Sequence, residues 1–280
     1  MSSITITDGV FGCGEILAKR VSAVLGYRYL GHEALMKAVQ RYRLPEAMPT
    51  NVLEVEPPWW KRLLENRRVY RIALQAAMCD IAEGGNFVCH GRASQELVPA
   101  IRHILKILLI VPNEYRMEQV RQAKGLAGEA AQRWVAKMDE VSDRRIKSIF
   151  GVGWRDPSRY DLVLNVSKLS FETAACLIVK TMEQVEYQVT GESEREFHNF
   201  ILEAKVRAAL MASANTCRIN VKVQANSGLV HLSSFLHPVE FDFRDEIIHI
   251  TAGVPGVKKV TADIQLLPIN DDSFALIQEK

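Results

Sequence analysis

The stretch from Ile4 to Tyr27 constrains the fold of this chain more than any other. A short run of β-branched and threonine residues at 4–7 precedes a glycine-rich segment at 9–14, and a helical run follows that Gly26 closes. This order builds a cradle for phosphate, because backbone N–H groups at a helix start point at the anion and the helix dipole favours negative charge there. The stretch therefore predicts a phosphate-binding loop. An ordinary strand-to-helix turn without a ligand is the alternative.

The spacing within the loop is that of a P-loop, but two side chains differ. Gly9 and Gly14 keep the G-x-x-x-x-G spacing, whereas Glu15 and Ile16 stand where such a loop has Lys and then Ser or Thr. A unit charge about 4 Å from a phosphate oxygen is worth roughly 4 kcal/mol at an effective dielectric constant of about 20, and Glu in place of Lys reverses its sign. The sequence therefore has the glycines of a phosphate-binding loop but lacks the lysine and the hydroxyl residue that take part in its chemistry.

Length and composition limit the class of protein. The 280 residues, of which 48% are hydrophobic, suffice for one large domain and a small one. The absence of a long apolar run and of a leader pattern predicts a soluble, cytoplasmic protein. Five scattered cysteines form no C-x-x-C pair and the seven histidines are equally dispersed, so we expect neither a zinc site nor a disulfide framework.

Charge argues against nucleic acid as a partner, since the net charge is only +2. Residues 1–184 carry +6 and residues 185–280 carry −4. A mildly basic first part suits a polyphosphate ligand. Unevenly distributed charges on solvated helix faces explain the split equally well.

The order of elements in the first part predicts a doubly wound α/β domain of P-loop type, with the site at the carboxyl ends of its parallel strands. Strands are expected at residues 4–7, 27–29, 86–90, 104–111 and 161–166. Helices are expected at residues 15–25, 33–43, 59–83, 113–150, with an interruption near residues 125 and 128, and 171–187. Residues 45–58 contain four prolines and predict a loop.

A polar stretch at residues 189–196 predicts a linker between residues 1–188 and a small second domain at residues 197–268, followed by a tail at 269–280. The second domain is predicted to contain helix 196–213, strands 219–225 and 229–235, helix 239–250 and strand 259–267. This is an α+β unit of order αββαβ.

Arginines stand where phosphoryl transfer would need them. Arg92 follows the third strand in the stretch H-G-R-A, and its planar fork suits a phosphate. Arg116 follows the fourth strand, and Arg144 and Arg145 lie in a charged segment that could fold over the site as a lid. Plain solvation is the alternative for that segment.

Other residues are weaker candidates. Asp8 and Asp139 are metal candidates only by location, and Cys13 suits a small position in a tight loop better than a reactive thiol. Trp154, Tyr160 and the pair at 59–60 could stack on a base, although core positions are the commoner role of such residues.

Residues 1–184 resemble the cytidylate-kinase-like proteins of bacteria, a branch of the nucleoside monophosphate kinases. The resemblance rests on I-T-I, F-G-C-G, L-G-Y-R-Y, H-G-R-A, V-P-N-E-Y-R and above all G-V-G-W-R-D-P-S-R-Y-D-L-V-L-N at residues 151–165, with L-S at 169–170. It implies a five-stranded parallel sheet with helices on both faces, a nucleotide triphosphate donor, a nucleoside monophosphate acceptor and an arginine-bearing lid.

The chain departs from the pattern of this family at positions that bear on chemistry. Gly9 stands in place of an arginine, and the loop is one residue shorter than usual. Gly31 stands where an aspartate follows the second strand, and Ser142 where an arginine follows Asp139 by three residues. These departures affect the expected transferase activity and leave the expected fold intact.

Residues 197–268 resemble a BON domain, a small module of bacterial envelope proteins proposed to bind phospholipid or other surfaces. The match rests on Val206 with Leu210, I-x-V-x-V at 219–223, G-x-V-x-L at 228–232 and V-P-G-V-x-x-V at 254–260. These positions form a fold and specify a ligand poorly. The resemblance implies a protein partner or a membrane surface.

Two classes of function follow. In the first, the chain transfers phosphate from ATP, with Mg²⁺ as the usual companion ion, to a pyrimidine monophosphate such as CMP or dCMP. Arg92, Arg116, Arg144 and Arg145 would then be catalytic, and the nucleotide would lie on the loop residues Gly9, Phe11, Gly12, Cys13, Gly14 and Glu15. In the second class, the chain is a catalytically inactive protein that senses a nucleotide and engages a partner through its second domain.

Overall fold

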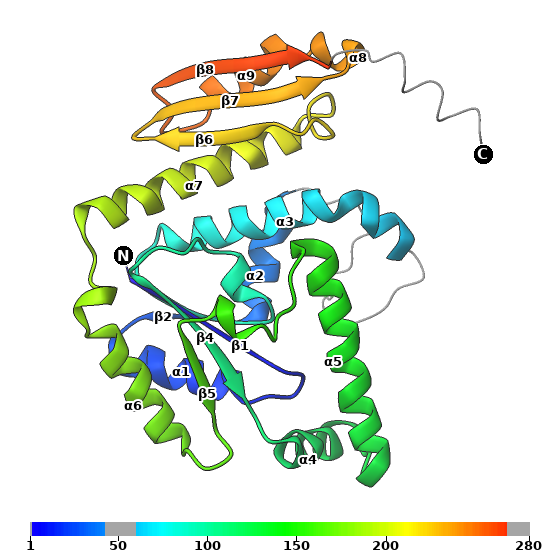
Figure 1. Ribbon diagram of the computed structural model, residues 1–280, viewed down its shortest axis with the longest axis vertical. Coiled ribbons are helices and arrows are strands. Elements are labelled where there is room, and N and C mark those ends of the chain that lie inside the picture. The colour runs from blue at the N-terminus through cyan, green and yellow to red at the C-terminus, as the bar shows by residue number, and fades with distance from the viewer. Residues whose placement is uncertain (1, 43–59, 268–280) are drawn as a thin grey trace. The chain divides into compact units, whose positions relative to one another are not determined.

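The computed structural model describes residues 2–42 and 60–267 (Figure 1). The chain divides into two compact units, Met1–Phe197 and His198–Lys280, which are described one after the other. The loop expected at residues 45–58, Trp59 and the tail expected at residues 269–280 lie outside the described residues.

The first unit is built on a parallel sheet of five strands in the order β2-β3-β1-β4-β5. The strands are β1 (Ser3–Asp8), β2 (Arg28–Leu30), β3 (Phe87–His90), β4 (Ile104–Ile110) and β5 (Leu162–Asn165). All six residues of β1 are buried, because this strand lies in the centre of the sheet and is covered on both faces. The predicted five-stranded parallel sheet is confirmed.

Helices cover both faces of this sheet (Figure 1). They are α1 (Gly14–Leu25), α2 (His32–Val39), α3 (Trp60–Ala82), α4 (Asn113–Lys124), α5 (Gly128–Phe150) and α6 (Phe171–Met182). Helix α1 packs against α6, and α3 packs against α2 and α5. Leu17, Val21 and Ile178 of α1 and α6 join Ile4 and Ile6 of β1 in the core of this unit.

The register of the sheet brings the ends of two strands together. Ile6 of β1 lies opposite His90, the last residue of β3, and Asp8 lies opposite Leu109 of β4. Asp8 and His90 therefore meet at the carboxyl edge, although 82 residues separate them.

The second unit contains a three-stranded sheet in the order β6-β7-β8. Its elements are β6 (Lys222–Asn226), β7 (Leu229–Leu236), α8 (Pro238–Phe241), α9 (Arg244–Ala252) and β8 (Lys259–Leu266), preceded by α7 (Gly191–Ala212). Strands β6 and β7 are antiparallel, and β8 is parallel to β7. Val206 of α7, Leu232 of β7 and Ile247 of α9 are completely buried at its core. The expected order αββαβ holds, except that the second helix is broken.

Several predicted element boundaries were wrong, among them the ends of three helices between residues 171 and 252. Helix α7 begins at Gly191, inside the stretch expected as a linker, because Thr190 and Ser193 exchange hydrogen bonds between side chain and backbone across its first turn. The helix expected at 239–250 is two helices: a capping box of His237 and Glu240 starts α8 at Pro238, α8 ends at Phe241, and α9 begins at Arg244. Helix α6 ends at Met182, and a 3-10 turn follows at Val185–Tyr187.

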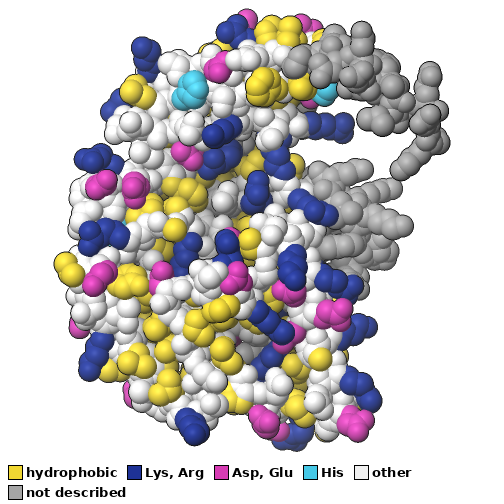
Figure 2. All heavy atoms as spheres, viewed as in Figure 1, with side chains coloured by type: hydrophobic (Ala, Val, Ile, Leu, Met, Phe, Trp, Pro, Cys, Tyr) yellow, Lys and Arg dark blue, Asp and Glu magenta, His cyan; other side chains and the backbone are white. Residues whose placement is uncertain are grey.

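On the side that Figure 2 shows, basic and acidic side chains are interspersed, with hydrophobic side chains among them. Within residues 2–42 and 60–267, no helix is both long and apolar enough to span a lipid bilayer.

His103 anchors the start of α7 within the first unit. The residue is completely buried, its Nδ1 lies 2.9 Å from the hydroxyl oxygen of Ser193, and its ring meets Phe197 edge to face at 5.6 Å between centroids. Burial lowers the pKa of His103 to about 4, because desolvation disfavours the charged imidazolium. The fold therefore requires the neutral imidazole.

We expect the first unit to lose stability in acid through this residue. The unfolded chain binds a proton to His103 near pH 6.5, whereas the folded chain binds it near pH 4, so the free energy of unfolding falls as the pH drops from about 6.5 to 4. The contribution is roughly 3 kcal/mol when complete. Urea unfolding at a series of pH values measures it. His103→Gln should flatten this part of the curve, and His198→Gln, which changes an exposed histidine of α7, should not. Equal pH profiles for the wild type and His103→Gln would contradict this account.

Candidate functional site

The glycine-rich loop lies between β1 and α1, at the carboxyl edge of the sheet where ligands bind in open parallel sheets. It is a tight turn, because the N–H of Gly12 donates to the carbonyl oxygen of Gly9 over 3.0 Å. Phe11 adopts a φ of 51°, which costs energy for a residue with a side chain. Its ring packs on Trp134 of α5, 5.4 Å away between centroids. The packing of Phe11 on Trp134 thus fixes the tip of the loop against α5.

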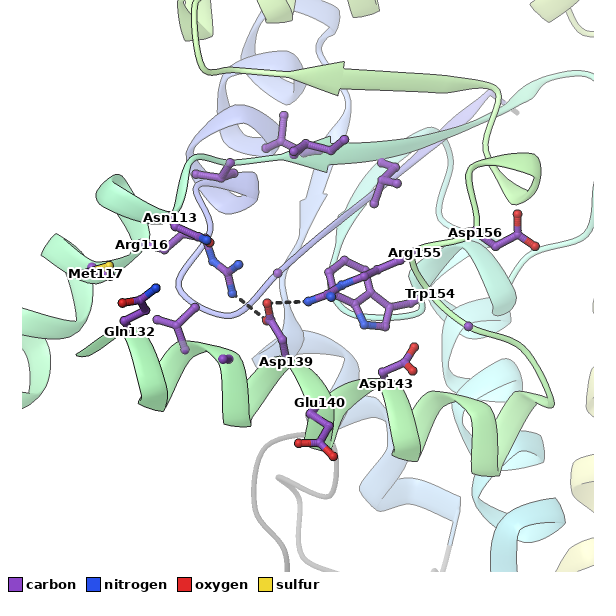
Figure 3. Close-up of a pocket in the computed structure, with 18 of the residues that line it drawn as sticks. Asn113, Arg116, Met117, Gln132, Asp139, Glu140, Asp143, Trp154, Arg155 and Asp156 are labelled. Carbon is purple, nitrogen blue, oxygen red and sulfur yellow. Dashed lines mark hydrogen bonds and ion pairs between the residues drawn. The ribbon is translucent and has the colours of Figure 1, made fainter. Parts of the chain in front are cut away.

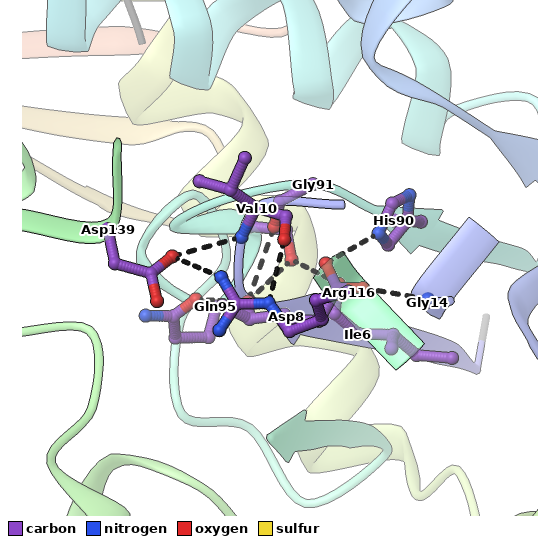
Figure 4. Close-up of polar contacts among 11 residues, drawn as sticks. Ile6, Asp8, Val10, Gly14, His90, Gly91, Gln95, Arg116 and Asp139 are labelled. Carbon is purple, nitrogen blue, oxygen red and sulfur yellow. Dashed lines mark hydrogen bonds and ion pairs between the residues drawn. The ribbon is translucent and has the colours of Figure 1, made fainter. Parts of the chain in front are cut away.

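The side chain of Asp8 fills the inside of this loop (Figure 4). Its Oδ2 accepts a hydrogen bond of 2.7 Å from the N–H of Gly14, and its Oδ1 lies 3.0 Å from Nε2 of His90. Only 4% of Asp8 is exposed. A Cβ atom at Gly12 would stand 2.1 Å from Oδ2, and one at Gly14 would stand 2.6 Å from the His90 ring. The glycines therefore make room for the protein's own carboxylate and its histidine partner.

This arrangement does not fit a magnesium–triphosphate ligand as it stands. The N–H that a phosphate would take at Gly14 is already donated to Asp8, and the carboxylate repels an anion. Glu15 pairs with Lys19 at 2.7 Å, and hydrogen bonding to that lysine lowers the pKa of Glu15. Ile16 offers no oxygen to a metal, and its side chain is 52% exposed. The loop presents negative rather than positive charge.

Cys13 is not a reactive thiol. It is 1% exposed, and burial followed by the charge of Asp8 raises the pKa of its thiol to about 12. The thiol is therefore protonated at neutral pH and serves as a small residue in the turn.

A second buried charge network joins the loop to α4 and α5 (Figures 3 and 4). Arg116 donates from Nε to the carbonyl oxygen of Val10 over 2.8 Å and from Nη2 to Oδ1 of Asp139 over 2.6 Å. The same Oδ1 accepts from the N–H of Val10 at 3.1 Å, and Oδ2 accepts from Arg155 at 2.7 Å. A Cβ at Gly9 would lie 2.9 Å from the guanidinium carbon of Arg116. Arg116 and Asp139 therefore clamp the loop.

Arg92 lies where the sequence predicts it, beside the loop. It lines a hollow of about 240 Å³ together with Gly12, His32 and His90, and its Nη1 donates to the hydroxyl of Ser142 over 2.5 Å. The hydroxyl of Ser142 thus gives Arg92 a neutral acceptor on α5.

The other two arginines of the predicted catalytic set lie elsewhere. Arg145 is 1% exposed, and its charge acts on the hydroxyl of Tyr70. Arg144 is exposed on α5. Neither residue lines the hollow beside the loop or the larger cavity described next. Of the four, the structure brings only Arg92 and Arg116 to the loop.

A larger cavity lies between α5, the end of β4 and the segment after α5 (Figure 3). Its volume is about 970 Å³. Its lining holds the Arg116–Asp139–Arg155 network, the ion pair of Asp143 with Lys147 at 3.0 Å, and the indole of Trp154.

Sequence reasoning missed the roles of several of these residues. It treated Asp8 and Asp139 as metal candidates, whereas each carboxylate accepts hydrogen bonds from N–H groups of the protein. Within the part of the chain that the structure describes, no three His, Cys, Asp or Glu side chains gather as metal ligands. His90 could have been noticed, because it ends the strand that precedes Gly91 and Arg92.

Comparison with known proteins gives a consistent picture for the first unit. A sequence profile of the cytidylate kinase-like family matches residues 3–168. A cytidylate kinase of Pyrococcus horikoshii is 28% identical over 117 residues, 42% of this chain and 60% of that protein. A cytidylate kinase of Methanopyrus kandleri is 33% identical over 99 residues, 32% of this chain and 51% of that protein. The chain thus spans about half to three fifths of the curated relatives it matches.

Among solved structures, an uncharacterized protein from Eubacterium ventriosum superposes with a TM-score of 0.50 at 18% identity. The match covers 65% of this chain and 98% of that one. At this identity the likeness concerns the fold alone.

We expect Asp139 to be the residue of the clamp whose loss costs most. Asp139→Ala leaves the buried guanidinium of Arg116 without its carboxylate, and breaking a buried pair in this way costs about 3–5 kcal/mol. Arg155→Ala removes a side chain that is 58% exposed and should cost less than about 1 kcal/mol. Urea unfolding of both variants measures the difference. Equal losses in the two variants would show that Asp139 is not the centre of the clamp.

Proposed function

Because the chain belongs to the cytidylate kinase-like family, we propose that it binds a nucleotide at the edge of the sheet that carries the loop and Arg92, without transferring phosphate from ATP. The observation that carries this proposal is the 2.7 Å hydrogen bond from the N–H of Gly14 to the carboxylate of Asp8. In this loop, the place of a phosphate oxygen is taken by an oxygen of the protein itself.

Electrostatics supports this proposal. A carboxylate about 4 Å from a phosphate oxygen opposes binding by roughly 4 kcal/mol at an effective dielectric constant of about 20. In a P-loop a lysine would offset this repulsion, but this chain has Glu15 at that position. A transfer reaction also needs positive charge where negative charge develops, and the loop supplies none.

The side of the loop that faces Arg92 is better suited to a phosphate. Asp8 and Glu15 also line this hollow, so a phosphate there has to be held against their charge by the hydrogen-bond donors of Arg92, His32 and His90. A hollow of about 240 Å³ accommodates a phosphate group and part of a sugar rather than a whole nucleotide. A nucleoside monophosphate with its phosphate at Arg92 and its base outside the hollow meets these limits.

The second unit would then carry the response to the nucleotide. We assign residues 189–196 as the junction and residues 197–268 as a BON-like domain that engages a protein or a membrane surface. The order of its elements and its buried positions Val206, Val230 and Leu232 support this assignment. A pull-down with residues 190–280, compared with the whole chain, tests whether this part recruits a partner by itself.

We expect Asp8→Asn to create affinity for ATP. The substitution keeps an oxygen for the Gly14 N–H and removes the negative charge, so ATP binding should strengthen at least tenfold. Calorimetry with and without Mg²⁺ measures this. Glu114→Gln, which makes the same change of charge on the exposed surface of α4, should leave binding unchanged. Tight, magnesium-dependent ATP binding by the wild type, with no gain in Asp8→Asn, would refute the proposal.

Phosphoryl transfer to a monophosphate is the second candidate, favoured by the position of Arg92 beside the loop. The two candidate functions differ in whether phosphate is transferred, and both require that a nucleoside monophosphate binds. For both, CMP should raise the melting temperature of the wild type by an amount that follows its concentration over its dissociation constant.

We expect Arg92→Ala to abolish this stabilisation by CMP, because it removes the fork that holds the phosphate. Arg133→Ala, which changes an arginine that is 75% exposed, is the matched control. An ADP-release assay with CMP, dCMP and UMP, run on the same proteins, separates the candidates. We expect no ADP release from the wild type with any of the three monophosphates. ADP release by the wild type that is lost in Arg92→Ala would show instead that the chain transfers phosphate.

A further inference from the structure

The three-stranded sheet of the second unit has two edges, and they differ in how they are covered. At the β6 edge, Glu203 of α7 accepts a hydrogen bond of 3.0 Å from the N–H of Ala225. Asn199 of the same helix accepts one of 2.8 Å from the N–H of Ser227. β8 forms the other edge (Figure 1). Among the described residues, the backbone of β8 forms hydrogen bonds only on the side that faces β7.

The two ends of β8 show which of its backbone groups point away from the sheet. Lys259 at its start donates its N–H to the carbonyl oxygen of Gly228 over 3.4 Å, and Leu267 after its end donates to Leu236 over 2.8 Å. Because the direction of these groups alternates along a strand, every second residue from Lys259 to Leu267 bonds to β7. The N–H and C=O groups at the free edge belong to the residues between them: Val260, Ala262, Ile264 and Leu266.

Nothing in the sequence of β8 interrupts this free edge. The register with β7 runs unbroken from Lys259 to Leu266, and the strand contains neither proline nor a bulge. Proline and bulges are devices that protect edge strands from pairing. A regular free edge of eight residues can therefore accept a further strand, which would take up its outward N–H and C=O groups.

The side chains of β8 alternate between two faces of the sheet. Ile264 belongs to the core of the second unit, and Val260 and Ala262 pack against that core. The residues between them, Lys259 and Asp263 among them, are exposed on the opposite face. These two are the charged residues of the strand, and they are of opposite sign. Thr261 lies midway between them on the same face.

This arrangement makes β8 complementary to itself. An antiparallel second copy, related by a two-fold axis through Thr261, places its Asp263 opposite Lys259, and the symmetry repeats this ion pair. In the same register, Val260 lies opposite Ala262 of the second copy. Both residues point their backbone groups outward, so the two strands can exchange N–H and C=O groups there.

Other registers lack this charge pairing. An axis through Asp263 would set two carboxylates against each other, and an axis through Lys259 would oppose two ammonium groups. An axis one residue to either side of Thr261 sets Lys259 and Asp263 opposite uncharged side chains. The charges of the free edge therefore select one register, and they favour a second copy of this strand over an unrelated peptide.

We propose that two copies of the chain associate by pairing their β8 strands antiparallel about Thr261, which joins two three-stranded sheets into one sheet of six strands. The proposal specifies the protein partner that was suggested above for the second unit as another copy of the chain. It requires no nucleotide, because the pairing uses only backbone groups and side chains of β8.

Sedimentation equilibrium of the whole chain over a wide range of concentration tests the association. We expect a monomer–dimer equilibrium in the wild type. Ala262→Pro removes one outward N–H and leaves those that face β7, so it should fold, as its melting temperature will show, and weaken the dimer at least tenfold. Arg92→Ala should leave the dimer unchanged, which separates this result from the proposed nucleotide site.

Charge variants test the register. Lys259→Asp and Asp263→Lys should each weaken the dimer at least tenfold, because each sets like charges opposite one another in both symmetry-related pairs. The two substitutions combined should restore it. Lys222→Asp, which makes the same change of charge at an exposed position of β6, is the control and should have no effect.

A cross-link gives a second measure of the register. Thr261→Cys should form a disulfide-linked dimer on mild oxidation, because residues opposite one another at such a position have Cα atoms about 4.5 Å apart. The wild type, which carries the exposed Cys176, and Gln265→Cys are the controls and should cross-link much less. A wild-type chain that stays monomeric up to high micromolar concentration would overturn the proposal. A dimer that the charge variants leave intact would do so as well.

Discussion

The hydrogen bond from the Gly14 N–H to the Asp8 carboxylate determines what the first unit can do. It forms because β1 pairs with β3 in a register that sets His90 beside Asp8, and because the glycines at 12 and 14 leave room for the two side chains. A buried carboxylate needs such partners, since an unpaired charge in the interior is costly. The loop therefore has the shape of a phosphate-binding loop, but the carboxylate of Asp8 already occupies its interior.

The clamp of Arg116 and Asp139 complements this arrangement from the other side. Asp139 accepts from Val10 in the loop, from Arg116 on α4 and from Arg155 after α5, so one carboxylate joins three separate segments of the chain. Two arginines that could have met a phosphate are thereby engaged within the protein. The first unit thus has the fold of a kinase-like domain, and its Arg116, Asp139 and Arg155 bind one another and stabilise that fold.

The fold could be predicted from the sequence because its signals are local. The strand, loop and helix at residues 3–25 and the buried strand at 104–110 follow from β-branched runs, glycines and helical spacing. The site could be predicted only in part. That Asp8 turns into the loop depends on His90, which lies 82 residues away in sequence, and no local pattern reveals that Arg145 is buried. The early start of α7 was detectable, because Thr190 and Ser193 have the spacing of a capping pair.

The backbone amide of Gly14 reports most directly on whether Asp8 closes the loop. Its ¹⁵N–¹H resonance can be followed while ATP and Mg²⁺ are added to the wild type and to Asp8→Ala, which has no side-chain acceptor for this N–H. We expect the wild-type signal to stay in place at millimolar ATP, because the N–H is donated to Asp8, and the signal of the variant to move. A wild-type Gly14 signal that shifts on addition of ATP and Mg²⁺ as far as it does in the variant would contradict the account.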